Sequence, residues 1–182
     1  MMPGRTEELS KKEKYLKMRL KEKRAIYRCS KYITLIDIPT WHDYYRVKYL
    51  QKNNNDDFGP IQNDLNRKVS LFFGDITSLE VDAIVNSANK NLRGGLGGVC
   101  DVILKAANSD LLEECIALGG CNTGDAKITG GYMLPAKYII HAVGPNIEDS
   151  HKLCSSYLKS LDRLLENKLK SIAFPCISTG LN

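Results

Sequence analysis

The chain has 182 residues, of which 43% are hydrophobic and 26% charged, with 6 Pro and 14 Gly. This composition is typical of a soluble globular protein and excludes collagen-like and broadly disordered chains. No apolar run approaches the ~20 residues that span a bilayer, and the first residues lack the apolar core of a signal peptide. Six Cys in such a chain indicate reduced thiols rather than a disulfide framework. We therefore expect a protein of the nucleus, the cytoplasm or both.

The net charge of +5 is unevenly distributed along the chain. Residues 1–31 contain eleven Lys or Arg and four Glu, a local charge of +7, whereas the remainder carries −2. The basic character therefore belongs to an N-terminal arm and not to the domain that follows. Two interpretations of the arm stay open: a solvated helix, or a weak contact with nucleic acid or an acidic partner. We expect no membrane partner and a monomeric protein.

The predicted N-terminal region is a basic helical extension over residues 1–51. Ser10 and Glu13 have the spacing of a capping box, and apolar residues follow at roughly helical spacing, which predicts one helix over 10–28. Residues 52–67 are rich in Asn and Asp around a Gly-Pro pair and are predicted to form a linker. The domain is expected to occupy residues 68–182.

Within the domain, apolar strands alternate with helical segments. The predicted strands cover residues 69–73, 82–88, 137–143 and 171–177. The predicted helices cover residues 98–107, 111–118 and 151–169. Continuously apolar strands are typical of a sheet covered on both faces, so the pattern predicts a three-layer α/β domain. The leucines that repeat along 151–169 are interpreted as core packing.

A glycine cluster precedes the first of these helices. Gly94, Gly95, Gly97 and Gly98 can adopt positive φ and allow a ligand close to the backbone. The N–H groups at a helix start attract anions, so the segment is predicted to hold a diphosphate; the alternative is a simple flexible turn. The cluster matches neither a P-loop nor the G-x-G-x-x-G pattern.

Polar residues also follow the predicted strands. Asn86 and Asn89 stand at the carboxyl end of the second strand, where ligands of open α/β sheets bind. They could read ribose hydroxyls or close Asx turns. Asp75 could accept a hydrogen bond from an exocyclic amine or cap a turn. The segment 178–180 (Ser-Thr-Gly) would offer further phosphate donors.

Three stretches together resemble a known family. GDITSLEVDAIVNSAN, GCNTGDAKITGGYMLPAKYIIHAVGP and AFPCISTG are similar to the macrodomain, specifically its MacroD-type branch, over about residues 68–180. The resemblance implies a three-layer α/β/α fold with a mixed, mostly parallel sheet. It also implies binding of ADP-ribose and hydrolysis of mono-ADP-ribose from acidic side chains of modified proteins. Those proteins and ADP-ribose are the expected partners.

The resemblance implies a role for each matching position. Asp75 and the backbone of Ile76 would hold the adenine, and Asn89 would bind the distal ribose and take part in catalysis with Asp101. The implied phosphate-binding residues are Gly94, Gly95, Gly97, Gly98 and Val99 in a first loop and Ser178, Thr179 and Gly180 in a second. No cofactor is implied. No metal is expected either, because His42, His141 and His151 have no partner at ligand spacing.

The sequence departs from the family pattern in the first loop and at its end. Cys100 occupies the position of the family aspartate, Asp101 follows one residue later, and Leu96 reads as an insertion. One step on a helix is about 100°, so either the loop shifts register and brings Asp101 to the site, or the aspartate's role is lost. The chain also stops just after the second loop begins, so we interpret it as truncated.

Three functions follow from these observations. The first is an ADP-ribose-protein hydrolase, and the second is a reader that binds ADP-ribose without cleaving it, which Cys100 favours. The third is a protein acting through its basic arm. A nucleophilic Cys100 near a helix start is a further idea, against which a buried, inert thiol is the default.

Overall fold

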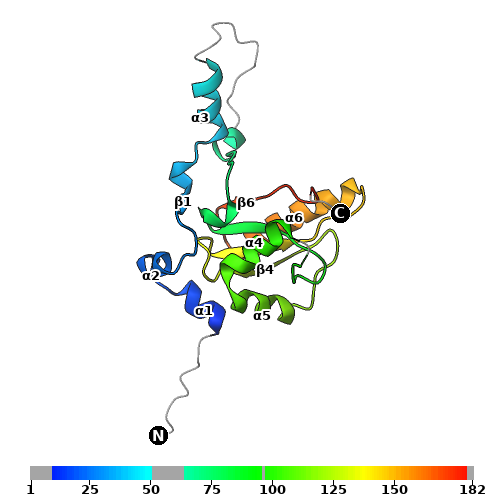
Figure 1. Ribbon diagram of the computed structural model, residues 1–182. Helices are drawn as coiled ribbons and strands as arrows, with labels where there is room; N and C mark the ends of the chain where they lie inside the picture. The colour runs from blue at the N-terminus through cyan, green and yellow to red at the C-terminus, as the bar shows by residue number, and fades with distance from the viewer. Residues whose placement is uncertain (1–9, 51–63, 96, 180–182) are drawn as a thin grey trace. The chain divides into compact units, whose positions relative to one another are not determined.

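The computed structural model describes residues 10–50, 64–95 and 97–179 (Figure 1). Its contacts divide the chain into two compact units, one formed by Ile33–Asp75 and the other by Met1–Tyr32 together with Ile76–Asn182. This division differs from the predicted boundaries, because the basic arm shares a unit with the α/β domain. Most of the predicted linker, residues 52–63, lies outside the described residues.

The larger unit contains a four-stranded sheet with the order β4-β5-β3-β6. The central strand β3 (Ala83–Ser87) runs parallel to β5 (Tyr138–Ala142) and β6 (Ile172–Ala173), whereas β4 (Ala126–Gly130) is antiparallel to β5. The mixed, mostly parallel sheet is therefore confirmed. β4 was not among the predicted strands, and β6 is shorter than predicted. A 3₁₀ turn, η4 (Ile76–Ser78), and the short strand β2 (Leu79–Glu80) precede β3 along the chain.

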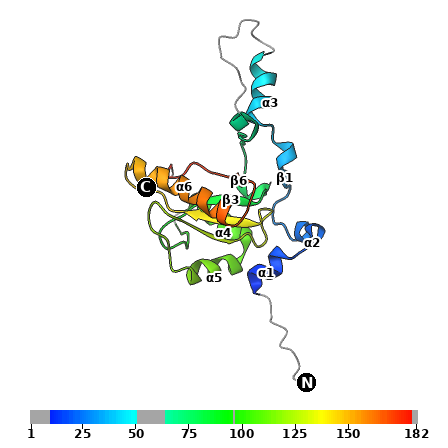
Figure 2. The same cartoon turned by 180° about the vertical axis from the view of Figure 1, so that it is seen from behind.

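Helices cover both faces of this sheet, as the opposite views in Figures 1 and 2 show. α4 (Gly98–Ala107) and α5 (Ser109–Ala117) lie on one face, and α6 (Ser150–Glu166) lies on the other. The predicted three layers are confirmed. Among the described residues, no helix has the length and hydrophobicity of a membrane span.

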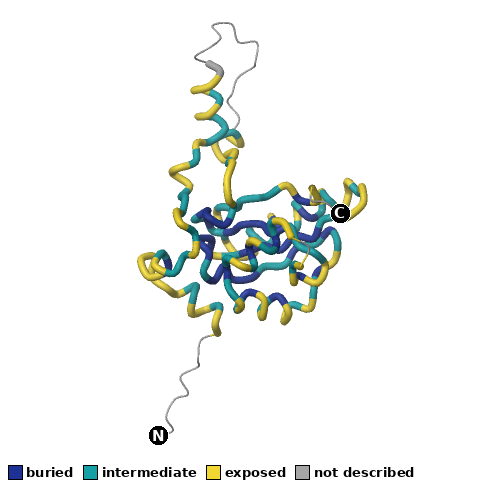
Figure 3. The backbone as a smooth tube through the Cα atoms, in the orientation of Figure 1, coloured by how far each residue is buried: buried dark blue, intermediate teal, exposed yellow. Residues whose placement is uncertain are grey.

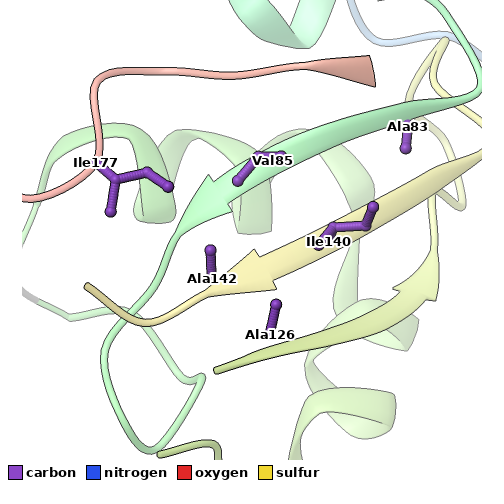
Figure 4. Packing of buried hydrophobic residues seen from close by; sticks show 6 residues of the cluster. All are labelled: Ala83, Val85, Ala126, Ile140, Ala142 and Ile177. Atoms are coloured by element: carbon purple, nitrogen blue, oxygen red, sulfur yellow. The ribbon is translucent and has the colours of Figure 1, made fainter. Parts of the chain in front are cut away.

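Alternation along the strands divides the core between the two faces. The face toward α6 holds a buried cluster, shown in Figure 4: Ala83, Val85, Ala126, Ile140, Ala142 and Ile177. Leu153, Tyr157 and Leu164 of α6 pack against it. The other face buries Ile84 and Ile139 with helix residues such as Ile103 and Leu111. Figure 3 shows the buried residues concentrated in the sheet.

The leucine stripe of α6 is only partly core, which corrects the sequence interpretation. Leu158 is 56% exposed and Leu165 is 70% exposed. The helix instead buries Ser156 and Ser160 completely, and their hydroxyls donate to the carbonyls of Val143 and Ser156 respectively. Small side chains with satisfied hydroxyls allow the helix to approach the strands closely, and this rotates part of the stripe outward.

The arm forms two short helices, α1 (Lys11–Leu16) and α2 (Leu20–Ala25), so the prediction of one helix over 10–28 is wrong. The capping box at Ser10 is present as predicted. Arg19 adopts extended backbone angles, φ −64° and ψ 147°, and its N–H donates to the Glu22 carboxylate at 3.0 Å. This second cap starts a new helix in a new direction.

Cations of the arm pair with acidic residues of the same unit. Lys11 lies 2.9 Å from Asp110 and 2.7 Å from Glu113, Lys12 pairs with Glu114 at 2.9 Å, and Arg24 donates two hydrogen bonds to Glu80. Lys23 is buried, with its ammonium 5.3 Å from the centre of the Tyr15 ring, and burial lowers its pKa to about 8. Part of the arm's positive charge is therefore neutralised by ion pairs within the larger unit.

The smaller unit consists of short elements. They are β1 (Ile33–Thr34), η1 (Leu35–Asp37), α3 (Trp41–Tyr45), the π-helical η2 (Arg46–Leu50) and η3 (Asp64–Arg67). The predicted strand over 69–73 is absent. Ser70 makes one isolated bridge with Thr40, and Leu71 and Phe73 are exposed.

Candidate functional site

The glycine loop leaves the carboxyl edge of the sheet and leads directly into α4. Gly94, Gly95, Gly97 and Gly98 all have positive φ, from 69° to 94°, a region that other L-residues rarely adopt. A Cβ at Gly94 would also collide with the side chains of Asp101 and Leu104. The loop conformation therefore requires these glycines. Leu96 lies outside the described residues.

Asn89 lies between β3 and this loop and is bonded to it. Its side-chain N–H donates to the carbonyl of Gly94 at 2.9 Å. Its Oδ1 is buried and has no hydrogen-bond partner in the part of the chain that the structure describes. A buried acceptor without a donor is costly, so Asn89 both orders the loop and presents an acceptor suited to a hydroxyl.

Asp101 lies against the loop from the first turn of α4. Its Oδ1 accepts a hydrogen bond from the Gly95 N–H at 2.6 Å, and its Oδ2 accepts one from the Gly97 N–H at 2.7 Å. The sequence left open whether Asp101 would reach the loop. The structure places its carboxylate on two of the N–H groups that were predicted to bind phosphate.

Cys100 turns the other way, toward the sheet. It is 7% exposed, and its sulfur accepts a hydrogen bond from Asn86 Nδ2 at 3.3 Å. Burial raises the pKa of the Cys100 thiol, so the residue at the family-aspartate position is a neutral thiol in the core. The default interpretation of an inert cysteine fits this environment better than a nucleophile does.

A buried polar cluster lies beneath α4 and α5. Asn86, Thr129 and His141 are each 0% exposed. Asn86 Nδ2 lies 3.1 Å from His141 Nδ1, and Thr129 Oγ1 lies 2.8 Å from Nε2. Because an amide nitrogen only donates, Nδ1 is the acceptor and Nε2 carries the proton. Burial lowers the pKa of His141 to about 4, so the ring is neutral and structural.

No metal site accompanies this cluster. Within residues 10–50, 64–95 and 97–179, no three His, Cys, Asp or Glu side chains gather in a way that could hold an ion.

The second predicted loop follows β6. Ser178 is exposed and has a positive φ of 62°, and the Thr179 hydroxyl donates to the Cys176 carbonyl at 3.0 Å. A Cβ at Gly144, just after β5, would collide with Ser178 Oγ. The loop after β6 therefore lies against the chain leaving β5. Gly180 lies outside the described residues.

The two positions predicted to hold the adenine, Asp75 and Ile76, fall on the two sides of the division between units. Asp75 is the last residue of the smaller unit and is exposed, whereas Ile76 opens η4 in the larger unit.

Parallel strands bring the remaining predicted residues to one edge. Asn89 and the glycine loop follow β3, and Ser178 follows β6, its direct neighbour. Val99 is half-buried in the first turn of α4. Sequence reasoning missed the importance of Gly144 and the use of Asn86 as a support for Cys100. No local pattern marks either role, because both depend on contacts distant in sequence.

A cavity of about 450 Å³ adjoins the loop on the outer side of α4. Gly95 and Asp101 line it together with the cationic residues Arg28, Arg93 and Lys105. Arg28 belongs to the arm and donates a hydrogen bond to the carbonyl of Lys105 at 2.9 Å. The Asp101 carboxylate thus lies between the loop N–H groups and a basic cavity.

The chain is similar to known proteins over most of its length. It is 50% identical to human ADP-ribose glycohydrolase MACROD2 over 177 residues, which cover 93% of this chain and 41% of that protein. It is equally identical to mouse ADP-ribose glycohydrolase MACROD1 over 167 residues, covering 88% of this chain and 51% of the relative. The chain therefore spans about half, or less, of the length of these relatives.

Solved structures and a family description agree with these similarities. The Trypanosoma brucei macrodomain in complex with ADP-ribose superposes with a TM-score of 0.75 at 32% identity, covering 95% of this chain and 66% of that one. The sequence model of the Macro domain matches residues 85–182, more than half of the chain. The chain belongs to the macro domain family, in its MacroD-type branch.

Proposed function

We propose that the protein binds ADP-ribose and hydrolyses mono-ADP-ribose from acidic side chains of modified proteins. The observation that carries this proposal is the glycine loop beside Asn89 at the carboxyl edge of the sheet. The names of relatives at 50% identity and the ADP-ribose complex of a structural neighbour support it.

Oriented backbone groups suit a diphosphate in this domain. Outside residues 1–31 the chain carries a charge of −2, so bulk attraction does not favour a polyphosphate. N–H groups displayed by consecutive positive-φ residues form a concavity that binds anions without any net positive charge. The free Oδ1 of Asn89 would accept a hydrogen bond from a hydroxyl of the distal ribose.

The proposed reaction is attack of water on the anomeric carbon of the distal ribose. A bond forms between the water oxygen and that carbon, and the carbon–oxygen bond to the side-chain carboxyl breaks. The carboxylate leaves and a proton passes to solvent. Holding the diphosphate and the ribose in place would provide most of the rate enhancement through positioning and charge stabilisation.

One observation favours a second candidate, a reader that binds without turnover. The family-aspartate position holds the buried Cys100, and the carboxylate of Asp101 is bonded to Gly95 and Gly97. A thiol facing the core cannot orient a water on the substrate. If Asp101 stays on the loop when the ligand binds, its carboxylate is not available for that task.

Binding is tested by calorimetry with ADP-ribose. We expect binding by the wild-type protein and at least tenfold weaker binding by Asn89→Ala, because that variant loses the ribose acceptor and the bond to Gly94. Asn167→Ala at the end of α6, whose side-chain amide donates to the carbonyl of Arg163, is the matched control and should bind normally. No binding by the wild type at millimolar ligand would refute the proposed function.

Turnover is tested separately with a glutamate-modified protein. Release of ADP-ribose above background supports the hydrolase. Binding without release selects the reader, and in that case activity gained by Cys100→Asp would locate the defect at this position.

A further inference from the structure

Asp101 occupies N–H groups that the proposed ligand needs. A backbone N–H donates one strong hydrogen bond, and those of Gly95 and Gly97 are directed at the Asp101 carboxylate at 2.6 and 2.7 Å. These are the short distances of charge-assisted bonds. A diphosphate that used the same two donors would have to displace the carboxylate, since two anions cannot share them without strong repulsion.

We propose that Asp101 is an internal competitor of the ligand, a specificity-determining residue whose carboxylate takes the place of a phosphate in the glycine loop until a diphosphate displaces it. This inference rests on the proposed function of ADP-ribose binding. The proposed role of Asp101, which follows Cys100 at the family-aspartate position, depends on the contacts that Asp101 makes in this chain.

Two features of the surroundings suit this exchange. Asp101 is only partly buried, so its side chain can rotate without disturbing the core. The cavity that it lines also contains Arg93 and Lys105, which offer the displaced carboxylate favourable charges. The loop donors are therefore satisfied in the free protein, and the carboxylate can be satisfied in the bound one.

The competition predicts a preference among ligands. A ligand with a diphosphate recovers the charge-assisted bonds that the carboxylate gives up. A ligand without phosphate, such as adenosine, leaves the Asp101 carboxylate on the loop. Its affinity should therefore not rise when that carboxylate is removed by substitution. Asp101 thus weakens binding of every ligand that enters the loop and favours those with enough negative charge to displace it.

Calorimetry with ADP-ribose tests the proposal on three proteins. We expect Asp101→Asn to bind about tenfold more tightly than the wild type, because a neutral amide holds the N–H groups less strongly and does not repel the phosphates. Asp162→Asn makes the same change of charge on α6, across the sheet, and should bind within twofold of the wild type. Equal or weaker binding by Asp101→Asn, with the wild type still binding, would overturn the proposal.

A measurement on the wild type covers the case in which the variant does not fold. The side-chain carboxyl carbon resonance of Asp101 should shift when ADP-ribose saturates the protein and should stay unchanged with adenosine. An unchanged resonance at saturation with ADP-ribose would show that the carboxylate is not displaced and would overturn the inference alone. Failure of all three proteins to bind ADP-ribose would instead overturn the proposed function, and this inference with it.

Discussion

The two faces of the central sheet are built differently. The face toward α6 is apolar, with Val85 and Ile140 packed among alanines. The face toward α4 and α5 includes Asn86, Thr129 and His141, all fully buried, with the His141 ring bonded to both of the other two. The loop that carries the candidate site leads into the helix on this polar face, and Asn86 contacts that helix through Cys100.

The difference indicates two kinds of contribution to the fold. Apolar packing contributes free energy roughly in proportion to buried area. A buried hydrogen-bonded cluster contributes little net free energy, but it is costly to leave half-satisfied, and it fixes geometry. We therefore expect the α6 face to dominate stability and the polar face to set the position of α4 beneath the loop.

The largest expected effect comes from opening the apolar face. Ile140→Ala should reduce the free energy of unfolding by about 3–4 kcal/mol, because the side chain is fully buried and its removal leaves a cavity. Urea denaturation measures this change. If Ile140→Ala lowers the free energy of unfolding by less than Thr129→Val does, the polar face contributes more to stability than the apolar face.

The second effect is a pH dependence that originates in His141. Burial lowers its pKa to about 4 from an ordinary 6.5. Below about pH 6.5, His141 is therefore protonated in the unfolded chain but stays neutral in the folded protein. The contribution of neutral His141 to the free energy of unfolding is therefore fully present above that pH. It falls on acidification, by about 2 kcal/mol between about pH 7 and pH 5. Urea denaturation at several pH values in this range should show that the free energy of unfolding depends less on pH in His141→Gln than in the wild type.

Three paired carboxylates contribute to the pH dependence mainly below that window. The pKa values of Glu80, Asp82 and Glu114 are lowered by hydrogen bonds from Arg24, Lys137 and Tyr132 respectively, against the opposing effect of burial. Their contributions are present above their ordinary values near 4 and are lost only at lower pH. If the free energy of unfolding changes with pH as steeply in His141→Gln as in the wild type, His141 is not the source of the pH dependence.

A smaller effect is expected from breaking one hydrogen bond of the cluster. Thr129→Val keeps the shape of the side chain but removes the hydroxyl acceptor 2.8 Å from His141 Nε2, which leaves only the weaker contact with the Cys115 sulfur at 3.7 Å. The expected cost is about 1–2 kcal/mol in urea denaturation. Thr123→Val, a change in a turn with a half-exposed side chain, is the control and should be near neutral.

The smallest effect should come from the solvent side of α6. Lys159 and Asp162 form an ion pair at 3.1 Å, with both side chains close to half exposed. Exposed pairs contribute little, so Asp162→Asn should shift the thermal midpoint by less than about 1 °C. A larger shift would mean that this surface contributes more than its exposure indicates.

The sequence predicted the elements whose pattern is local. The helix over 98–107 was predicted at the bounds found for α4, because glycines precede it and apolar residues recur along it. The strands around Val85 and Ile140 were recognisable as continuous apolar runs. The parallel arrangement then explains why Asn89 and Ser178 follow neighbouring strands at one edge of the sheet.

The remaining features depend on contacts that no local pattern contains. β4 reads as AKITG, with too few apolar residues to mark a strand, and it forms because β5 offers an edge. The apolar segment 69–73 makes one isolated bridge, between Ser70 and Thr40, and does not extend it into a strand. Asp101 stands one helical step from Cys100 and points away from it, as counting positions predicts. Counting could not give the course of the loop, in which glycines with positive φ bring two backbone N–H groups to the Asp101 carboxylate.

Gly144 connects two parts of the candidate site that are distant in sequence. Because it has no side chain, Ser178 can rest where a methyl group would otherwise stand. An alanine at this position would push the turn around Ser178 outward and open the gap between the strand ends. The absence of one carbon atom thus sets how closely the loop after β6 can approach the chain leaving β5.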